Sequence, residues 1–231
     1  MDAQGLPRSG AEFFRAVTRR VLTLWWLKMP GTMIGIAGFF AAYFWVLRHP
    51  FFPVTVMPLT TMDAWIVFRP EALWLYVSLW FYVGLLPALL ENFKELVAYV
   101  GQVLALSAAG LGIFIFWPTA VPVRAIDWAK HPGFDVLKGV DATGNACPSL
   151  HVAFAVFSAI GIGRVLREMR VGRAWRGVNW VWCAGIGYST VAIGQHVVLD
   201  VIAGAALGAA AGFGLPWMAR RGARAGKTGV G

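Results

Sequence analysis

Six stretches of the chain are almost continuously apolar and long enough to cross a lipid bilayer. A transmembrane helix needs about 20 predominantly apolar residues, and uninterrupted runs of this length are typical of membrane-embedded helices. The pattern predicts helices over residues 29–47, 73–90, 97–117, 149–166, 178–195 and 196–218. The last two nearly touch, so we expect a tight hairpin whose turn lies at His196 or a few residues to either side.

The segment before the first apolar run has a different pattern. Residues 1–28 combine charges with the pair Trp25-Trp26 at helical spacing, which is typical of an amphipathic helix in the membrane interface. The polar part is long and no small-residue cleavage site follows a short apolar core, so we do not expect a cleavable signal peptide. The predicted units are an interfacial segment (1–28), a membrane domain (29–218) and a basic tail (219–231).

Composition supports a membrane protein. The chain has 58% hydrophobic and 13% charged residues and a mean hydropathy of +0.65, whereas soluble domains carry about a quarter charged residues. The predicted fold class is therefore all-α, a polytopic membrane protein built as one six-helix bundle.

Basic residues are divided unequally between the two sides of this bundle. Of the 20 Lys and Arg residues, 15 fall on the side of both termini and 5 on the other. Basic residues near spans stay in the cytoplasm, so we expect cytoplasmic termini, outer loops at 48–72 and 118–148, and a bacterial inner (plasma) membrane location. Topology and anionic lipid headgroups account for the net charge of +9. No motif that reads nucleic acid accompanies it.

Two polar motifs interrupt the apolar runs on the predicted outer side. In "GQHVVLDVIAG", His196 and Asp200 are four residues apart, a spacing that shares one helix face. The carboxylate can then accept a hydrogen bond from one imidazole nitrogen and leave the other as a nucleophile or general base. A carboxylate about one turn into a bilayer is costly without a partner, which favours a functional role over a stray polar residue.

The second motif is "ACPSLHVAF". Pro148 is well tolerated at the start of a helix, so Ser149 and His151 fall in a first turn whose unpaired N–H groups attract anions, especially phosphate. Ser149 as a helix cap is compatible with a phosphate contact. The predicted topology brings both histidine motifs to one membrane face.

These motifs resemble those of the type 2 phosphatidic acid phosphatase (PAP2) superfamily. "PSLH" and "STVAIGQHVVLD" are similar to the family motifs P-S-G-H and S-R-x5-H-x3-D, and Ser189, Thr190, His196 and Asp200 stand at the spacing of the second. The substitution of arginine by Thr190 and of glycine by Leu150 is more similar to the branch of inositol phosphorylceramide synthases and related lipid phosphotransferases. The stretch "PTAVPVR", which ends at Arg124, resembles that branch's first motif.

The resemblance implies a mechanism without a metal or other cofactor. His196 would attack the phosphorus of a lipid phosphate and form a phosphohistidine, Asp200 would orient the ring, and His151 would protonate the leaving oxygen and then activate water or an alcohol. Ser149, Arg124 and the first N–H groups of the helix from 149 would hold the phosphate oxygens. The resemblance also implies that Ser189 and Thr190, which stand at positions of the second motif, lie at the phosphate site.

Two positive charges of the family pattern are missing. Trp117 stands where the first motif has a lysine, and Thr190 replaces an arginine. Candidate replacements are Lys130, Lys138 and the amide of Asn145. A phosphate site with fewer charges suits a phosphodiester better than a dianionic monoester, so head-group transfer is favoured over simple phosphatase action on phosphatidate or a polyprenyl phosphate.

Other classes of protein stay open. His151, His196 and Asp200 also suit a metal or proton site of a transport protein, whereas an intramembrane protease would need Ser149 as nucleophile without the usual small-residue elbow. We expect lipid partners and no disulfide between Cys147 and Cys183. The oligomeric state is open, because the glycine and alanine run at 203–214 can pack inside the bundle or between protomers.

Overall fold

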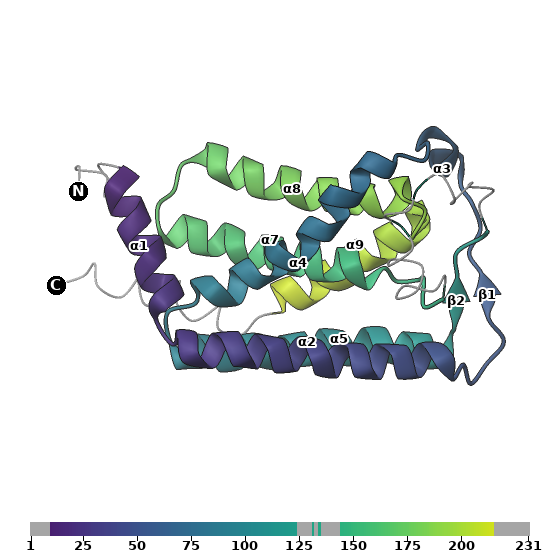
Figure 1. Cartoon of the computed structure of the whole chain (residues 1–231), viewed down its shortest axis with the longest axis horizontal. Helices are drawn as coiled ribbons and strands as arrows, with labels where there is room; N and C mark the ends of the chain where they lie inside the picture. The colour runs from purple at the N-terminus through teal and green to yellow at the C-terminus, as the bar shows by residue number, and fades with distance from the viewer. Residues whose placement is uncertain (1–9, 124–130, 132–133, 135–143, 215–231) are drawn as a thin grey trace, which may run out of the picture.

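A computed structural model describes residues 10–123, 131, 134 and 144–214. Within these residues the chain is mostly helical (Figure 1), as the predicted all-α class requires. A helix corresponds to each predicted span, with ends shifted by a few residues. They are α2 (Trp25–Arg48), α4 (Leu73–Leu89), α5 (Phe93–Phe116), α7 (Leu150–Glu168), α8 (Arg173–Ala192) and α9 (Val198–Phe213).

Four of these helices are long and apolar enough to cross a membrane. They are α2, α4 together with the 3-10 turn η1 (Pro70–Ala72), α5 and α7. Helix α8 carries Arg173, Arg176 and Asn179 in its first two turns, and α9 has only 16 residues. By length and composition, the described residues therefore support four of the six predicted spans, and the other two stay predictions.

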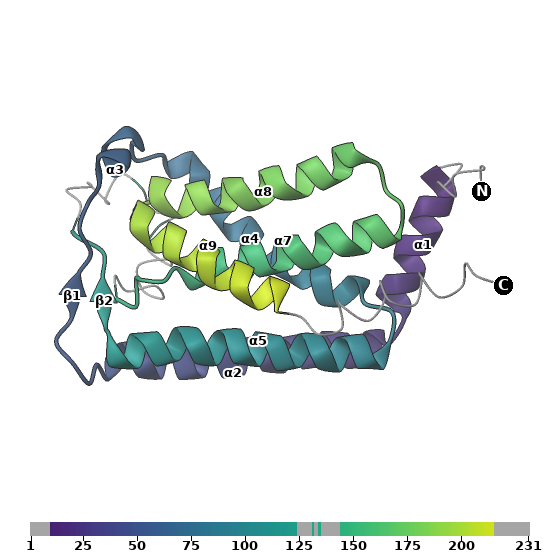
Figure 2. The same ribbon diagram turned by 180° about the vertical axis from the view of Figure 1, so that it is seen from behind.

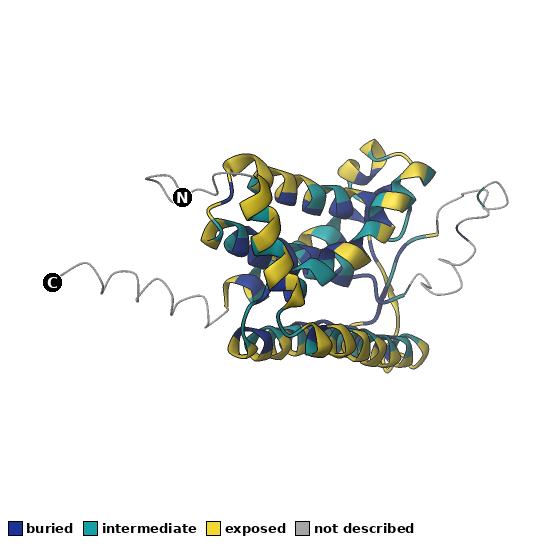
Figure 3. Cartoon of the chain, turned by 60° about the vertical axis from the view of Figure 1, so that its left-hand side comes forward, coloured by how far each residue is buried: buried dark blue, intermediate teal, exposed yellow. Residues whose placement is uncertain are grey.

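The helices fall into two groups, which Figures 1 and 2 show from opposite sides. Helices α2 and α5 lie side by side along one edge, and α4, α7, α8 and α9 pack together above them. Helix α7 is the most buried of the four candidate spans. In its most apolar stretch 67% of the residues are buried, against at most 33% in the corresponding stretches of the other three; Figure 3 shows the buried residues in dark blue. The motif that contains His151 is therefore anchored in the most buried of the four candidate spans.

A row of glycines brings α9 onto the backbone of α7. A Cβ atom at Gly204 would overlap the carbonyl oxygen of Ser149, and one at Gly208 would overlap that of Ala153. Glycine is the residue that allows such a close backbone approach. This face of the glycine and alanine run thus packs inside the chain.

The N-terminal segment contains a helix, α1 (Gly10–Leu22). Its end docks on the connection between α4 and α5, where Arg20 Nη1 donates to the carbonyl oxygen of Leu89 at 3.1 Å and the guanidinium of Arg19 meets Glu91 at 2.9 Å. A location of α1 in the membrane interface stays a prediction. The basic tail 219–231 lies outside the described residues.

A small structure that the apolar pattern does not predict joins the two outer connections. Strands β1 (Thr55–Val56) and β2 (Thr119–Ala120) pair in parallel, and the short helix α3 (Thr61–Trp65) follows β1. In Figure 1 these elements lie at the end of the bundle where α7 and α9 begin.

Candidate active site

A line of hydrogen bonds crosses the end of the bundle near β1 and β2 (Figure 1) and joins three helices. The Tyr76 hydroxyl on α4 is 2.7 Å from Nε2 of His151, and Nδ1 of His151 is 3.3 Å from Nε2 of His196. Nδ1 of His196 is 3.4 Å from Oδ2 of Asp200. The structure thus brings together the three residues for which the sequence predicts catalysis, and it adds a tyrosine.

His196 lies in the turn between α8 and α9, where the predicted hairpin has its turn. The one difference from the prediction is that His196 and Asp200 do not share a helix, because only Asp200, the third residue of α9, is helical. The turn is held by the carbonyl oxygen of Thr190, which accepts hydrogen bonds from the backbone N–H groups of Gln195 and His196. Asp200 Oδ2 also accepts a hydrogen bond from the N–H of Val197 at 3.0 Å.

An ionised carboxylate only accepts hydrogen bonds. With Asp200 ionised, Nδ1 of His196 carries the hydrogen, Nδ1 of His151 donates to the lone pair on Nε2 of His196, and the Tyr76 hydroxyl donates to Nε2 of His151. In that arrangement His196 presents a basic nitrogen toward His151, which is the state that a nucleophile needs.

Asn145, which lines the same cavity as the two histidines, has an unused donor. Its backbone has a left-handed φ of 53°, it is 6% exposed, and its Nδ2 has no hydrogen-bond partner among the described residues. Strand β2 shapes this loop, because Thr119 Oγ1 accepts from the N–H of Cys147 at 2.8 Å and Thr119 O accepts from that of Ala146. A buried amide donor without a partner is suited to an anionic ligand.

Ser149 caps α7 and links the two motifs through its backbone. Its Oγ accepts from the N–H of Val152 at 3.4 Å, and its own N–H donates to the carbonyl oxygen of Asp200 at 3.0 Å. The side chain is fully buried. The cap predicted from the sequence is present, and a phosphate contact of this hydroxyl stays a prediction.

The remaining predicted phosphate ligands do not belong to the line of hydrogen bonds between Tyr76 and Asp200. Ser189 and Thr190 are fully buried in the last turn of α8, where their hydroxyls donate to the carbonyl oxygens of Ile186 and Gly187. Both therefore support the turn that carries His196. Arg124 and Lys138 lie outside the described residues.

Sequence reasoning missed two side chains that hold the site. Asp63 Oδ1 accepts from the N–H of Val198 at the start of α9, and its Oδ2 accepts from the N–H and hydroxyl of Thr60. The Thr60-x-x-Asp63 pattern is a capping signal that could have identified this residue. Tyr76 gives no such signal, because it stands inside an apolar run.

Both cysteines are free and buried, as expected for a chain without a disulfide. Burial and the neighbouring carboxylate of Asp200 raise the pKa of the Cys147 thiol to about 11. Within the described part of the chain, no group of three or more His, Cys, Asp and Glu side chains has an arrangement that could hold a metal ion.

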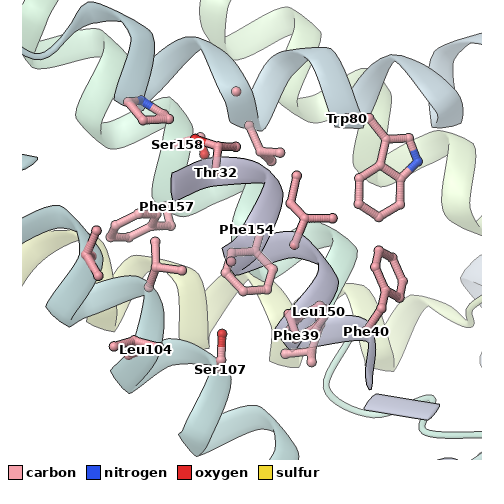
Figure 4. Close-up of a pocket in the computed structure, with 18 of the residues that line it drawn as sticks. Thr32, Phe39, Phe40, Trp80, Leu104, Ser107, Leu150, Phe154, Phe157 and Ser158 are labelled. Atoms are coloured by element: carbon pink, nitrogen blue, oxygen red, sulfur yellow. The ribbon is translucent and has the colours of Figure 1, made fainter. Parts of the chain in front are cut away.

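The histidines open onto an apolar cavity of about 1060 Å³. Helices α2, α4, α5 and α7 supply nearly all of its lining, and Asn145, His151 and His196 belong to the same lining. Figure 4 shows the labelled part of the wall, which is mostly aromatic and aliphatic. The polar site is thus continuous with a large hydrophobic space.

A protein-family model matches the region of the chain that contains this site. The family model of the PAP2 superfamily matches residues 68–223, which is more than half of the chain. The matched region contains Tyr76 and both histidine motifs. Searches of curated proteins and of solved structures gave no significant match.

Proposed function

Because the chain belongs to the PAP2 superfamily, a family of phosphatases and phosphotransferases, we propose that it is a membrane enzyme that transfers the phosphorylated head group of a lipid through a phosphohistidine. The observation that carries this proposal is the line of hydrogen bonds from Asp200 through His196 to His151, at the end of an apolar cavity.

His196 is the nucleophile in this proposal. The lone pair of Nε2 attacks the phosphorus in line with the leaving oxygen, so that an N–P bond forms as a P–O bond breaks. Asp200 holds Nδ1–H and stabilises the positive charge that develops on the ring. The substrate's phosphoryl group must come between the two imidazoles, whose facing nitrogens are 3.3 Å apart in the substrate-free arrangement.

His151 is the general acid and then the general base. In its protonated form Nδ1–H gives a proton to the leaving oxygen, while Nε2–H donates to the Tyr76 oxygen, which is 2.7 Å away. Neutral His151 then takes a proton from the acceptor, water or an alcohol, as the acceptor oxygen attacks phosphorus and the N–P bond breaks. Nε2–H stays on the ring through both steps, so the Tyr76 oxygen accepts from it throughout and Nδ1 of neutral His151 has the lone pair that takes the proton.

The non-bridging phosphate oxygens need donors that are in place before the reaction. The free Nδ2 of Asn145 and the first N–H groups of α7 supply neutral donors. Arg124 and Lys138 supply charge in this proposal, and the hydroxyls of Ser149, Ser189 and Thr190 bind the phosphate by rotating away from their present partners. A site with so few cations favours a phosphodiester, so head-group transfer is preferred to hydrolysis of a phosphomonoester.

The proposed location follows from the charge distribution. The site lies at the bundle end that carries the outer connections, so it would face the periplasm, with both termini in the cytoplasm. The lipid substrate would enter from the membrane, because the cavity beside the histidines is apolar.

The decisive assay is incubation of purified protein with a panel of phospholipids and lipid phosphates, with and without diacylglycerol and polyols. A new phosphorylated lipid is the result expected of a transferase. Release of inorganic phosphate alone would favour the simple phosphatase. The His196→Ala protein, prepared in the same detergent, is the control. A reaction that this variant catalyses as well as the wild type would overturn the proposal.

A further inference from the structure

Three consecutive backbone N–H groups fix the turn that carries His196. The N–H of His196 itself donates to a carbonyl oxygen in the last turn of α8 at 3.1 Å, and that of Val197 donates to Oδ2 of Asp200 at 3.0 Å. The third, the N–H of Val198, donates to Oδ1 of Asp63 at 2.8 Å. One of the three anchors of the turn therefore comes from α3, outside the pair of helices that the turn connects.

The carboxylate of Asp63 is held in place by its own short helix. Asp63 is 6% exposed, and its Oδ2 accepts hydrogen bonds from the backbone N–H of Thr60 at 2.8 Å and from the Thr60 hydroxyl at 2.7 Å. These local bonds leave Oδ1 directed at the N–H of Val198. The residue before Val198 is Val197, whose apolar side chain cannot cap a helix. Asp63 therefore supplies the cap of α9 from a distant part of the chain, and its negative charge is favourable at a helix N-terminus.

The strands beside α3 hold the same turn by packing. Strand β1 is followed by Met57, a member of a buried cluster that also contains Val121, Ala146, Cys147 and Val197. Strand β2 pairs with β1 and binds the N–H groups of the loop that precedes α7. One small structure at this end of the bundle (Figure 1) therefore contacts both the turn before α9 and the loop before α7.

Met57 and Asp63 lie outside the region by which the family is recognised. The match to the family model begins at residue 68, and both β1 and α3 precede it. The turn that carries His196 is thus supported by a segment of this chain that the family model does not cover.

Building on the proposed function, we infer that Asp63 is a positioning residue for the nucleophile and acts through the N–H of Val198. It fixes the backbone two residues after His196, and with it the ring position that gives 3.4 Å to Oδ2 of Asp200 and 3.3 Å to Nδ1 of His151. Reacting groups must be held within about 0.5 Å of their productive geometry. Loss of the Asp63 contact therefore slows the attack on phosphorus and leaves substrate binding largely intact.

Asp63→Asn tests this role with little change of shape. The amide has one acceptor oxygen, so it cannot accept from Val198 on one side and Thr60 on the other. The probe is bis(p-nitrophenyl) phosphate, a soluble phosphodiester whose nitrophenolate leaves without a proton, so a single turnover with excess enzyme follows attack by His196 alone. We expect its rate constant to fall by about tenfold or more, and the enzyme concentration for half-maximal rate to change by less than about threefold.

Val198→Pro removes the donor of the same hydrogen bond instead of its acceptor. Proline is well tolerated at the first position of a helix, and Val197 already has the extended backbone that a following proline requires, with φ −103° and ψ 165°. We expect a loss of rate similar to that of Asp63→Asn, and the double variant should be no slower than either single variant. Losses that multiply in the double variant would show that Asp63 does not act through Val198 and would overturn the inference.

Met62→Asn is the matched control, because it introduces the same side chain one residue earlier on α3, at a position that is 53% exposed. It should keep the wild-type rate constant. A readout without substrate comes from the ring N–H resonances of protein with isotope-labelled histidine, in which His196→Ala identifies the signal of His196 among four histidines. That signal depends on the bond to Asp200, so it should shift in Asp63→Asn and stay in place in Met62→Asn. An unshifted signal in Asp63→Asn would contradict the positioning role.

The two readouts separate this inference from the proposed function. If the His196 signal shifts as expected but neither the wild type nor any variant turns over a phosphate ester, the proposed function fails and the positioning role stands. If the wild type reacts through His196 and Asp63→Asn keeps both the wild-type signal and the wild-type rate constant, the positioning role fails alone.

Discussion

Tyr76 is the residue that ties the general acid to the rest of the bundle. Its hydroxyl holds Nε2 of His151 and thereby directs Nδ1 toward His196. It is 3% exposed, so water does not replace it easily. Removing the hydroxyl would leave the ring of His151 without the bond that sets its tautomer and orientation.

Tyr76→Phe should therefore lower the rate by up to about tenfold, the effect of one neutral hydrogen bond of about 0.5–1.5 kcal/mol. The loss should be larger for a lipid ester, whose alkoxide needs a proton, than for a nitrophenyl ester, whose leaving group does not. Tyr82→Phe is the control, because the Tyr82 hydroxyl donates to Asn179 Oδ1 at 2.8 Å, away from the site. Equal losses for the two esters would show that Tyr76 does not act through His151.

Asp200→Asn tests the orientation of the nucleophile. The amide still offers an oxygen to the N–H of Val197, so the turn should persist. It no longer supplies a negative charge for Nδ1–H of His196, and we expect kcat to fall by about 100-fold or more. Steady-state kinetics with a lipid ester measure this change, and circular dichroism checks the fold. A variant with wild-type kcat would remove Asp200 from the mechanism.

The Cys147 thiol should react slowly with alkylating reagents. A thiol with its ordinary pKa of 9.0 is roughly one-tenth ionised at pH 8, whereas a pKa of about 11 leaves about one-thousandth. The raised pKa therefore lowers the rate at pH 8 by about 100-fold, and the rate should climb about tenfold per pH unit up to about pH 11. Mass spectrometry of Cys147 labelling in folded and SDS-denatured protein measures this difference. Equal rates in both states would contradict the buried position beside Asp200.

At the scale of elements, the contact between α7 and α9 holds the two histidine motifs together. Gly208 touches the backbone of Ala153, and Gly204 touches that of Ser149. Gly208→Ala forces the helices apart and should destabilise the protein by about 1–3 kcal/mol. Gly112→Ala, on α5 in open space, should leave stability nearly unchanged. Thermal unfolding in detergent compares the two, and equal midpoints would show that the contact is not tight.

The sequence predicts the helices better than it predicts the site between them. Long apolar runs leave few alternatives to helices, so all six predicted elements have a counterpart in the fold. Strands of two residues, such as β1 and β2, are too short to show a periodic pattern. The i, i+4 spacing of His196 and Asp200 suggested one helix, but the same separation also fits a turn followed by the third residue of α9.

The partners of the site were the hardest part to predict. Tyr76 and Asp63 contribute through contacts across 75 and 135 residues of sequence, which local patterns do not encode. The pairing of His151 with His196 was accessible, because the predicted order of spans brings both motifs to the same end of the bundle. The phosphate role of Arg124 remains a prediction from the resemblance, and that of Lys138 remains a prediction that it replaces a missing charge of the family pattern.

At the scale of the whole molecule, the account requires that one end of the bundle faces the cell exterior. Val123, in the outer connection after β2, is 94% exposed, and Gly172 precedes α8 on the opposite side. In intact cells Val123→Cys should react with a membrane-impermeant maleimide and Gly172→Cys should not. Both native cysteines are buried, and replacing Cys147 with serine removes any remaining background. The reverse labelling would place the site in the cytoplasm.

The central claim is that His196 carries the phosphoryl group during turnover. The direct measurement is a rapid acid-free quench of the enzyme with a labelled lipid phosphate, followed by mass spectrometry of the peptide that contains residues 194–204. We predict phosphohistidine at His196 in the wild type and none in His196→Ala. In His151→Ala we predict it with a nitrophenyl phosphate, whose leaving group needs no proton, because only the second step is then slow. Phosphate on any other residue, or full turnover by His196→Ala, would contradict the account.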